Sequence, residues 1–244
     1  MSRIQSLDVP IEWSKTYLQR SMWVYQAVMR WKAREVPSLL VRPDRTKIVI
    51  EAFPRSSNSF CVRLFRGANP GYAIDEVSHH AHIISNVRHA AKWGIPSLVI
   101  VRDPVEAISS NMIVRGNTTD AMLEVLAVKY LDFYRWVEAN PEAVVVAEFS
   151  DITKGRFKRV SERLNERFGS SFNTDFDEDD LASSVRAGIE KASPNKDDSS
   201  RIPIPSAERE ARYAELRPHI RAHSALEEPI ELYARLSEIV TRES

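Results

Sequence analysis

Two polar clusters carry the side chains best suited to bind anions, and each follows an apolar run. The first is Arg55-Ser56-Ser57-Asn58-Ser59, which comes after the run KIVIEAF at 47–53. Serine hydroxyls, an asparagine amide and a permanently charged guanidinium together suit a phosphate or sulfate group. A helix that begins within this cluster adds free N–H groups and a favourable dipole. The alternative is a surface turn with ordinary helix capping.

The second cluster begins at Arg102, directly after the apolar run 97–101, and reaches Ser110 eight positions later. Asp103 suits an N-cap, Pro104 suits the first helical position, and Glu106 completes a capping-box pattern. On such a helix, positions 103, 107 and 110 share one face, so Arg102 and Ser110 can bracket one phosphate. The alternative is an arginine paired with nearby carboxylates and a serine packed in its helix.

Three histidines lie between these clusters, in Ser78-His79-His80-Ala81-His82. A histidine can take up a proton near neutral pH, so this stretch is the best source of a general base. His80 is the first choice, followed by His79 and then His82. His79 and His82 could also share a helical face and bind a metal ion, but no cysteine or acidic motif accompanies them, and we expect no metal. Purely structural histidines are the remaining alternative.

The elements around these residues alternate in type. Apolar runs at 47–53, 97–101 and 143–147 predict buried strands, and helical spacing predicts helices over 121–137 and 157–168. This alternation predicts βαβ units in a three-layer α/β sandwich with a mostly parallel sheet. Ligands of such sheets bind at the carboxyl ends of the strands, where both anion clusters lie. Two anion sites at one edge suit a nucleotide with two phosphate-type groups.

The rest of the chain is expected to complete one domain over 1–244. Region 1–46 contains an amphipathic helix at 13–32, which either lies on the core or faces a membrane surface or a partner. Region 47–172 is the α/β core, and 173–206 is a long loop or lid, interrupted by a helix at 181–191. Helices follow over 207–244.

The composition of the chain excludes several classes of function and site. Lys and Arg total 34, as do Asp and Glu, so the basic excess typical of a nucleic-acid binder is absent, and no nucleic-acid partner is expected. Cys61 is the sole cysteine, which excludes an intramolecular disulfide. The chain has no apolar run long enough to span a membrane, and 1–15 lacks a signal-peptide pattern. We therefore expect a cytoplasmic protein.

Both clusters resemble motifs of the sulfotransferase family that uses 3′-phosphoadenosine 5′-phosphosulfate (PAPS). Residues 53–60 are similar to the loop that binds the 5′-phosphosulfate, and Val101-Arg102-Asp103-Pro104 with Ser110 is similar to the 3′-phosphate motif. The resemblance covers about 47–152. It implies a fold like that of P-loop nucleotide kinases, PAPS as donor, and 3′-phosphoadenosine 5′-phosphate (PAP) as product.

The resemblance also implies roles for single residues. Arg55 would contact the phosphosulfate and stabilise the leaving oxygen, while Arg102 and Ser110 would bind the 3′-phosphate. His80 lies at about the separation from the 3′ motif at which relatives carry a catalytic histidine. The remaining donor-binding residues implied are Ser56, Ser57, Asn58 and Ser59 for the 5′-phosphate, and Phe60 near the adenine. The family's Arg-Lys-Gly segment near the C-terminus is not evident here, and Arg201 in the expected lid is a candidate substitute for it.

Ser57 stands where the family usually has glycine, so a left-handed backbone there would be strained.

The acceptor is expected to be a small molecule or carbohydrate with a hydroxyl or amine, bound between 67–82, the helix after Ser110 and the 173–206 loop. Two other functions stay open. A nucleotide or small-molecule kinase would need a magnesium ligand, for which Glu148 is a poor candidate, and the Walker A pattern is absent. The second alternative function is that of a non-catalytic nucleotide-binding module. The oligomeric state is open.

Overall fold

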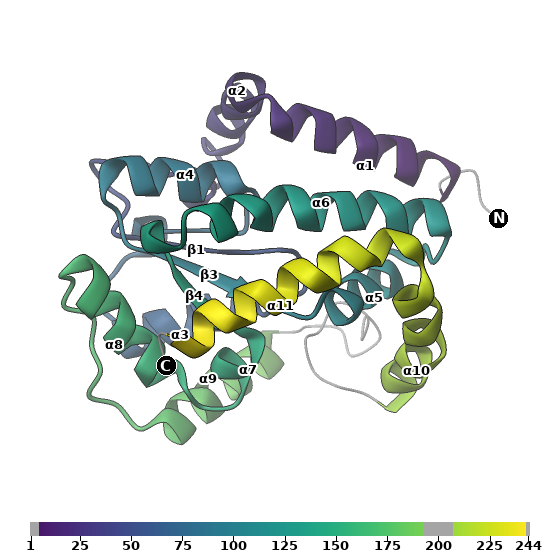
Figure 1. The fold of residues 1–244 in the computed structure, drawn as a ribbon. Coiled ribbons are helices and arrows are strands. Elements are labelled where there is room, and N and C mark those ends of the chain that lie inside the picture. The colour runs from purple at the N-terminus through teal and green to yellow at the C-terminus, as the bar shows by residue number, and fades with distance from the viewer. Residues whose placement is uncertain (1–4, 193–206, 243–244) are drawn as a thin grey trace.

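A parallel sheet of four strands forms the centre of the molecule (Figure 1), in a computed structural model that describes residues 5–192 and 207–242. The strand order is β2-β1-β3-β4, and every neighbouring pair is parallel. The carboxyl ends of all four strands therefore lie at one edge of the sheet. The strands are β1 (Ile48–Ala52), β2 (Val77–His79), β3 (Ser97–Val101) and β4 (Val145–Glu148).

Helices cover both faces of this sheet, as the alternating sequence pattern predicts. Side chains of α4, α5, α6 and α11 pack on one face, and those of α3, α7, α8 and α9 on the other. The helices are α1 (Gln5–Arg20), α2 (Met22–Lys32), α3 (Asn58–Ala68), α4 (Ile84–Trp93), α5 (Pro104–Arg115), α6 (Asp120–Ala139), α7 (Phe149–Thr153), α8 (Phe157–Phe168), α9 (Glu178–Ala192), α10 (Ala207–Ala222) and α11 (Glu227–Arg242).

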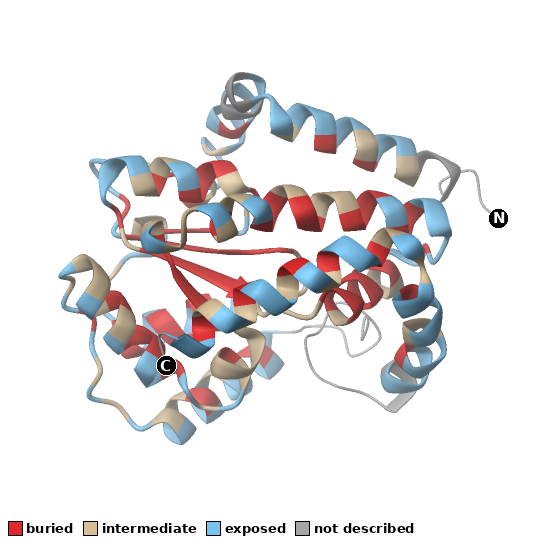
Figure 2. Cartoon of the chain, viewed as in Figure 1, coloured by how far each residue is buried: buried red, intermediate tan, exposed pale blue. Residues whose placement is uncertain are grey.

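The strands form because their apolar, β-branched runs can be buried on both faces. Every residue of β1 and β3 is buried, and Figure 2 shows the sheet as a continuous buried layer. Val49 and Val99 contribute to one apolar cluster, whereas Ile50 and Leu98 contribute to the other. The alternation of side chains along each strand thus supplies two cores, one on each side of the sheet.

The buried hydroxyl of Tyr134, on α6, ties the ends of two strands together. It donates to the carbonyl oxygen of Ile100 at 2.6 Å and accepts from the backbone N–H of Phe53 at 3.2 Å. These bonds satisfy polar groups at the point where β1 leaves the sheet. They also fix the starting direction of the loop that follows β1.

The predicted single helix over 13–32 is wrong. The chain instead forms α1 and α2, with an extended residue, Ser21, between them. Serine competes for backbone hydrogen bonds and therefore favours helix ends over helix interiors. Tyr17 and Trp31, whose spacing suggested the apolar face of that helix, are exposed, whereas Glu12 and Thr16 are buried. Helix α1 packs on α6, on the outside of the sandwich.

Smaller differences concern element bounds. The third predicted strand lies at 145–148 instead of 143–147, because Pro141–Ala143 forms a 3₁₀ turn. The helix expected at 181–191 extends over Glu178–Ala192, so the expected loop at 173–206 is largely helical in its first half. Residues 193–206, the rest of the expected lid, lie outside the described residues. None of the described helices is long and apolar enough to cross a membrane.

Candidate functional site

The first anion cluster forms a tight loop between β1 and α3. Arg55 and Ser57 both adopt left-handed backbone conformations, with φ of 73° and 64°. The first intrahelical bond of α3 runs from Cys61 N to Ser57 O at 3.0 Å. The N–H groups of the preceding helical residues therefore lack intrahelical acceptors and are available to an anion. The strand, loop and helix follow in the predicted order, and Ser57 has the positive φ expected from its place in the motif.

Arg102 joins the end of β3 to this loop. Its Nη1 donates to the carbonyl oxygen of Arg55 at 2.6 Å, and its guanidinium lies 4.3 Å from the centre of the Phe149 ring. Nη2 is 3.5 Å from Glu106, and only 17% of the Arg102 side chain is exposed. The guanidinium is thus held in one orientation by a backbone acceptor, a carboxylate and an aromatic face.

Asp103 caps α5 as predicted, but the reciprocal half of the predicted capping box is wrong. Asp103 accepts hydrogen bonds from Val105 N and Glu106 N at 2.8 and 3.2 Å. The Glu106 carboxylate instead accepts a hydrogen bond from Nη2 of Arg217, on α10, at 2.8 Å and also faces Arg102. Charged partners compete successfully with a backbone N–H because ionic hydrogen bonds are the stronger ones.

Ser110 lies beside Arg55, so the two predicted anion clusters meet. Arg55 Nε donates to Ser110 Oγ at 3.2 Å, and the Tyr213 hydroxyl, from α10, donates to the same oxygen at 3.0 Å. The Ser110 hydroxyl keeps its own hydrogen to donate. The participation of Tyr213 has no signal in the sequence, because Tyr213 follows Ser110 by about a hundred residues.

The three histidines lie at the end of β2 and in the loop after it, not on a helix as the metal alternative requires. His80 Nε2 is 2.7 Å from Ser59 Oγ, which connects this loop to the first turn of α3. His79 Nδ1 donates to Val77 O at 2.6 Å, and His82 Nδ1 donates to Ala52 O at 2.8 Å. Each of those two rings therefore carries its proton on Nδ1 when neutral. Within 5–192 and 207–242, no group of His, Cys, Asp and Glu is placed to hold a metal ion.

The buried carboxyl group of Glu51, on β1, shapes the histidine loop and was missed in the sequence analysis. It accepts hydrogen bonds from Ala81 N at 3.1 Å, His82 N at 2.9 Å and Asn86 Nδ2 at 3.3 Å. Burial raises the pKa of Glu51 to about 8, although these bonds oppose the shift. The acidic residue inside the apolar run KIVIEAF was the available signal. Its bonds support the positive φ of His80 and His82, 64° and 51°.

The histidine rings are kept neutral by their surroundings. His80 is exposed at the surface, yet desolvation of its ring by neighbouring groups, followed by the charges of His79, His82 and Arg63, lowers its pKa to about 4. Burial also lowers the pKa of His79 and His82. A neutral imidazole has a lone pair that can accept a proton, so the cluster is in its basic form at neutral pH.

The structure brings five of the predicted site residues into two hydrogen-bonded sets around the loop after β1. Arg55, Arg102 and Ser110 form the first set, and Ser59 with His80 forms the second. Ser56 in the same loop and Asn58 at the start of α3 are buried, and the Asn58 amide has no hydrogen-bond partner among the described residues. Phe60 lies to one side, with Arg186 over its ring at 5.8 Å. Arg201 lies outside the described residues.

Comparisons with known proteins give a distant structural similarity. No protein-family model matches the chain, and no curated protein sequence matches it. Among solved structures, the chain is similar to mouse sulfotransferase SULT7A1 complexed with PAP. The two are 13% identical, with 84% of this chain and 92% of the mouse chain covered and a TM-score of 0.47. A similarity this distant leaves the activity and the donor to be inferred from the geometry of the site itself.

The Ser57→Gly variant should be more stable than the parent chain. A residue with a Cβ is strained at φ 64°, and glycine removes the strain at some cost in unfolded-state entropy. We expect the free energy of unfolding to rise by about 0.5–1 kcal/mol. The matched control is Ser184→Gly, at an exposed position inside α9, which should lower it by about 0.3–0.5 kcal/mol. Urea unfolding measures both, and a Ser57→Gly variant less stable than the parent would contradict the strain.

His80 should titrate well below an ordinary histidine in the free protein. Its folded pKa is about 4 and its unfolded pKa about 6.5, so the unfolded chain binds the extra proton first as pH falls. His80 therefore contributes to a loss of stability as pH decreases from about 6.5 towards 4. An NMR titration, with His80→Ala to assign the signal, measures the pKa directly. A His80 signal with its midpoint at about pH 6.5 or above would contradict this environment.

Proposed function

We propose that this chain is a sulfotransferase that moves a sulfuryl group from PAPS to a hydroxyl or amine of a small-molecule or carbohydrate acceptor. The observation that carries the proposal is the hydrogen-bonded link between the two anion loops. Arg102 bonds to the backbone of Arg55, and the Arg55 side chain bonds to Ser110. Two anion-binding loops that touch in this way suit one ligand with two phosphate-type groups.

The residues present fit such a donor. Arg102 and Ser110 offer a guanidinium and a hydroxyl at the end of β3 for the 3′-phosphate, and Tyr213 orients Ser110. The first turn of α3 offers its N–H groups for the 5′-phosphate. Asn58 adds an amide that is only 4% exposed and unpartnered among the described residues. A buried amide without a partner costs free energy unless a ligand supplies one, which favours a bound anion here.

PAPS supplies the activated sulfuryl group, whose bond to the 5′-phosphate breaks as the bond to the acceptor oxygen or nitrogen forms. Negative charge then grows on the leaving phosphate. Arg55, which lies in the loop after β1 and bonds to Ser110, is placed to neutralise that charge. The acceptor loses its proton, and a neutral histidine with a free lone pair can take it.

His80 is the proposed base because it is the histidine bonded to the donor loop. Its Nε2 contacts Ser59 Oγ at 2.7 Å, and the Glu51 bonds to Ala81 and His82 fix the backbone just after it. Its ring is unprotonated at neutral pH, but a pKa of about 4 makes it a weak base in the free protein, so the proposal rests on its position. His79 and His82 remain alternatives, since each has a neutral ring whose Nδ1 is engaged and whose Nε2 can accept.

The kinase alternative lacks a suitable magnesium ligand at β4. The two carboxylate oxygens of Glu148 accept hydrogen bonds from Tyr233 at 3.1 Å and Ser237 at 2.5 Å. Burial also raises the pKa of Glu148, which disfavours the charged form that magnesium needs. Glu148 instead serves to hold α11 against the sheet.

The donor site is tested by calorimetric titration with PAP, beside ATP with and without magnesium. We expect micromolar binding of PAP without metal, weaker binding of ATP, and a loss of about 10- to 100-fold in PAP affinity for Arg102→Ala, the effect of one charged hydrogen-bonding group. The matched control is Arg159→Ala, an exposed arginine of α8. Ser110→Ala gives a second test if Arg102→Ala fails to fold. No PAP binding, or a preference for magnesium-ATP, would contradict the proposal.

Turnover separates a transferase from a binding module. PAPS is supplied with a panel of alcohol, phenol, sugar and amine acceptors, and PAP release is measured. His80→Ala should bind PAP within about twofold of the parent and lose at least about 100-fold in kcat, the usual contribution of a general base. Full PAP binding with no turnover on any acceptor would favour the non-catalytic module. Unchanged kcat in His80→Ala with a loss in His82→Ala would move the base to His82.

A further inference from the structure

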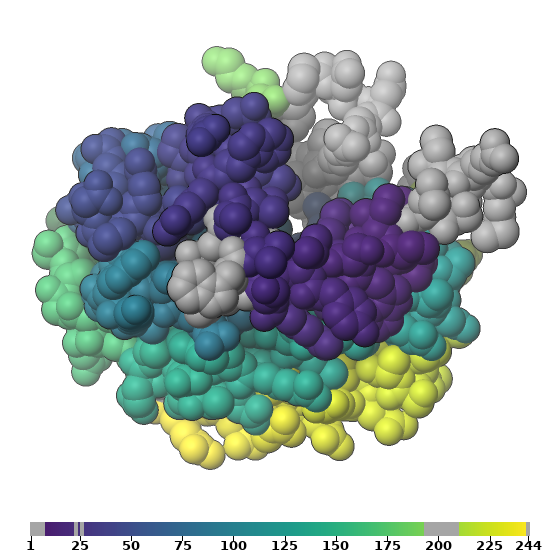
Figure 3. Space-filling model, turned by 90° about the horizontal axis from the view of Figure 1, so that it is seen from above, coloured from purple at the N-terminus to yellow at the C-terminus, as the bar shows by residue number. Residues whose placement is uncertain are grey.

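A cavity of about 530 Å³ opens between α1, α2, α4 and α6 and reaches the start of the loop after β1. The N-terminal helices, purple in Figure 3, lie beside α4 and α6 on this side of the molecule. The cavity is of the size that holds a drug-sized or disaccharide ligand. It overlaps the predicted acceptor pocket only at Ala81, His82 and Arg115, because 67–80 and α9 do not line it, whereas the N-terminal helices do.

The cavity is strongly basic. Six cationic side chains line it, and two carboxylates, Glu12 and Asp132, oppose them, so positive charge exceeds negative by four. The cationic residues are Lys15, Arg20, Lys32, Arg88, Arg115 and Lys129. For a chain whose formal net charge is zero, this is a local concentration of positive charge, which attracts anions.

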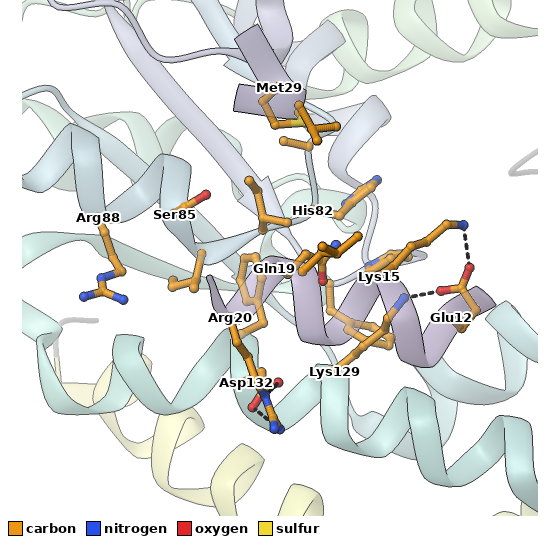
Figure 4. A pocket seen from close by; sticks show the side chains of 18 of the residues that line it. Glu12, Lys15, Gln19, Arg20, Met29, His82, Ser85, Arg88, Lys129 and Asp132 are labelled. Carbon is orange, nitrogen blue, oxygen red and sulfur yellow. Dashed lines mark hydrogen bonds and ion pairs between the residues drawn. The ribbon is translucent and has the colours of Figure 1, made fainter. Parts of the chain in front are cut away.

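Three of the six cationic side chains pair with Glu12, and Figure 4 shows two of them, Lys15 and Lys129. The Glu12 carboxylate, 3% exposed, pairs with Lys15 at 2.7 Å, with Arg115 at 3.0 Å and with Lys129. Burial alone would raise the pKa of Glu12, but the lysine hydrogen bonds outweigh it and lower the pKa to about 2. One carboxylate thus faces three cations. A structural ion pair needs only one cation. Burying the charged Lys129 side chain, which is 14% exposed, costs free energy.

Two further arginines of the lining, Arg20 and Arg88, differ in whether a carboxylate pairs with them. Arg20 forms two hydrogen bonds with Asp132, at 2.8 and 3.1 Å, and is therefore compensated. Arg88, an exposed residue of α4, has no carboxylate partner among the described residues. Figure 4 shows Arg88 at one side of the cavity and Lys129 with Glu12 at the other. Positive charge is therefore in excess on both sides of the cavity.

The remaining wall is apolar and adjoins the candidate site. Leu18 and Val28 are its exposed apolar side chains, and Phe53, Phe133 and Met29, each at most 4% exposed, also line it. Pro54, which precedes Arg55, and His82, two residues after His80, also line the cavity. The same two loops that carry the proposed charge-stabilising arginine and base thus form one wall of the basic cavity.

We propose that this cavity binds the acceptor and selects acceptors that join an apolar or ring-shaped body to an anionic group. The inference rests on the proposed function for the role of the ligand as acceptor. The anionic group pairs with the excess charge around Lys129 and Arg88, and the ring packs on Leu18 and Val28, the exposed apolar side chains of the lining. The acceptor hydroxyl or amine then points to the wall formed by Pro54 and His82.

The test uses 1-naphthyl phosphate as the anionic probe and 1-naphthol as its neutral counterpart, titrated by calorimetry with PAP present at saturation. PAP occupies the donor site, so phosphate binding there is blocked. We expect the phosphate to bind at least about tenfold more tightly than the naphthol. Lys129→Gln and Arg88→Gln should each weaken phosphate binding by about three- to tenfold and leave naphthol binding unchanged.

The controls separate this inference from the proposed function. Lys158→Gln, on the exposed side of α8 across the sheet, makes the same charge change and should leave both affinities unaltered. Lys129→Gln leaves Glu12 with Lys15 and Arg115, and Arg88→Gln breaks no ion pair among the described residues, so both variants should fold. Equal affinity for the two probes, or no effect of either variant, overturns the inference. If PAP does not bind, the proposed function fails, and the same titrations without PAP still test the basic cavity.

Discussion

Arg102 holds the end of β3 against the loop that follows β1, and the candidate site depends on this link. Its guanidinium donates to the Arg55 carbonyl at 2.6 Å and lies against Phe149 and Glu106. Since β1 and β3 are parallel neighbours, their carboxyl ends already lie at one edge of the sheet. The arginine turns that proximity into a fixed geometry, in which the Arg55 side chain reaches Ser110. Its guanidinium therefore positions the two anion loops as well as contributing a charge.

The second constraint is conformational strain in the backbone of two loops. Arg55, Ser57, His80 and His82 all have positive φ, a conformation that costs free energy for residues with a Cβ. Tyr134 fixes the start of the first loop, and Glu51 fixes the second through its bonds to backbone N–H groups. Strain of this kind persists only where the surroundings compensate for it. Here it is concentrated in the two loops that are joined by the bond between Ser59 and His80.

Local sequence signals predicted the elements that position the site, because these signals act over a few residues. The apolar run of β3, the Asp103 cap and the helix over 157–168 follow from spacing and composition, and the structure confirms them. Features set by distant partners were not predictable. The strand β2 has only three residues, two of them polar. Tyr213 reaches Ser110 across about a hundred residues, and the surface of α6 decides which face of α1 is buried.

A crystal structure of the protein with PAP would show whether this edge of the sheet binds the nucleotide. We expect the 3′-phosphate within hydrogen-bond distance of Arg102 and Ser110, and the 5′-phosphate at the first turn of α3, bonded to Asn58 or Ser59. Arg55 and His80 should then flank the position from which the sulfuryl group leaves. A nucleotide bound elsewhere on the molecule, or one whose phosphates avoid both loops, would contradict the proposal that sulfuryl transfer takes place here.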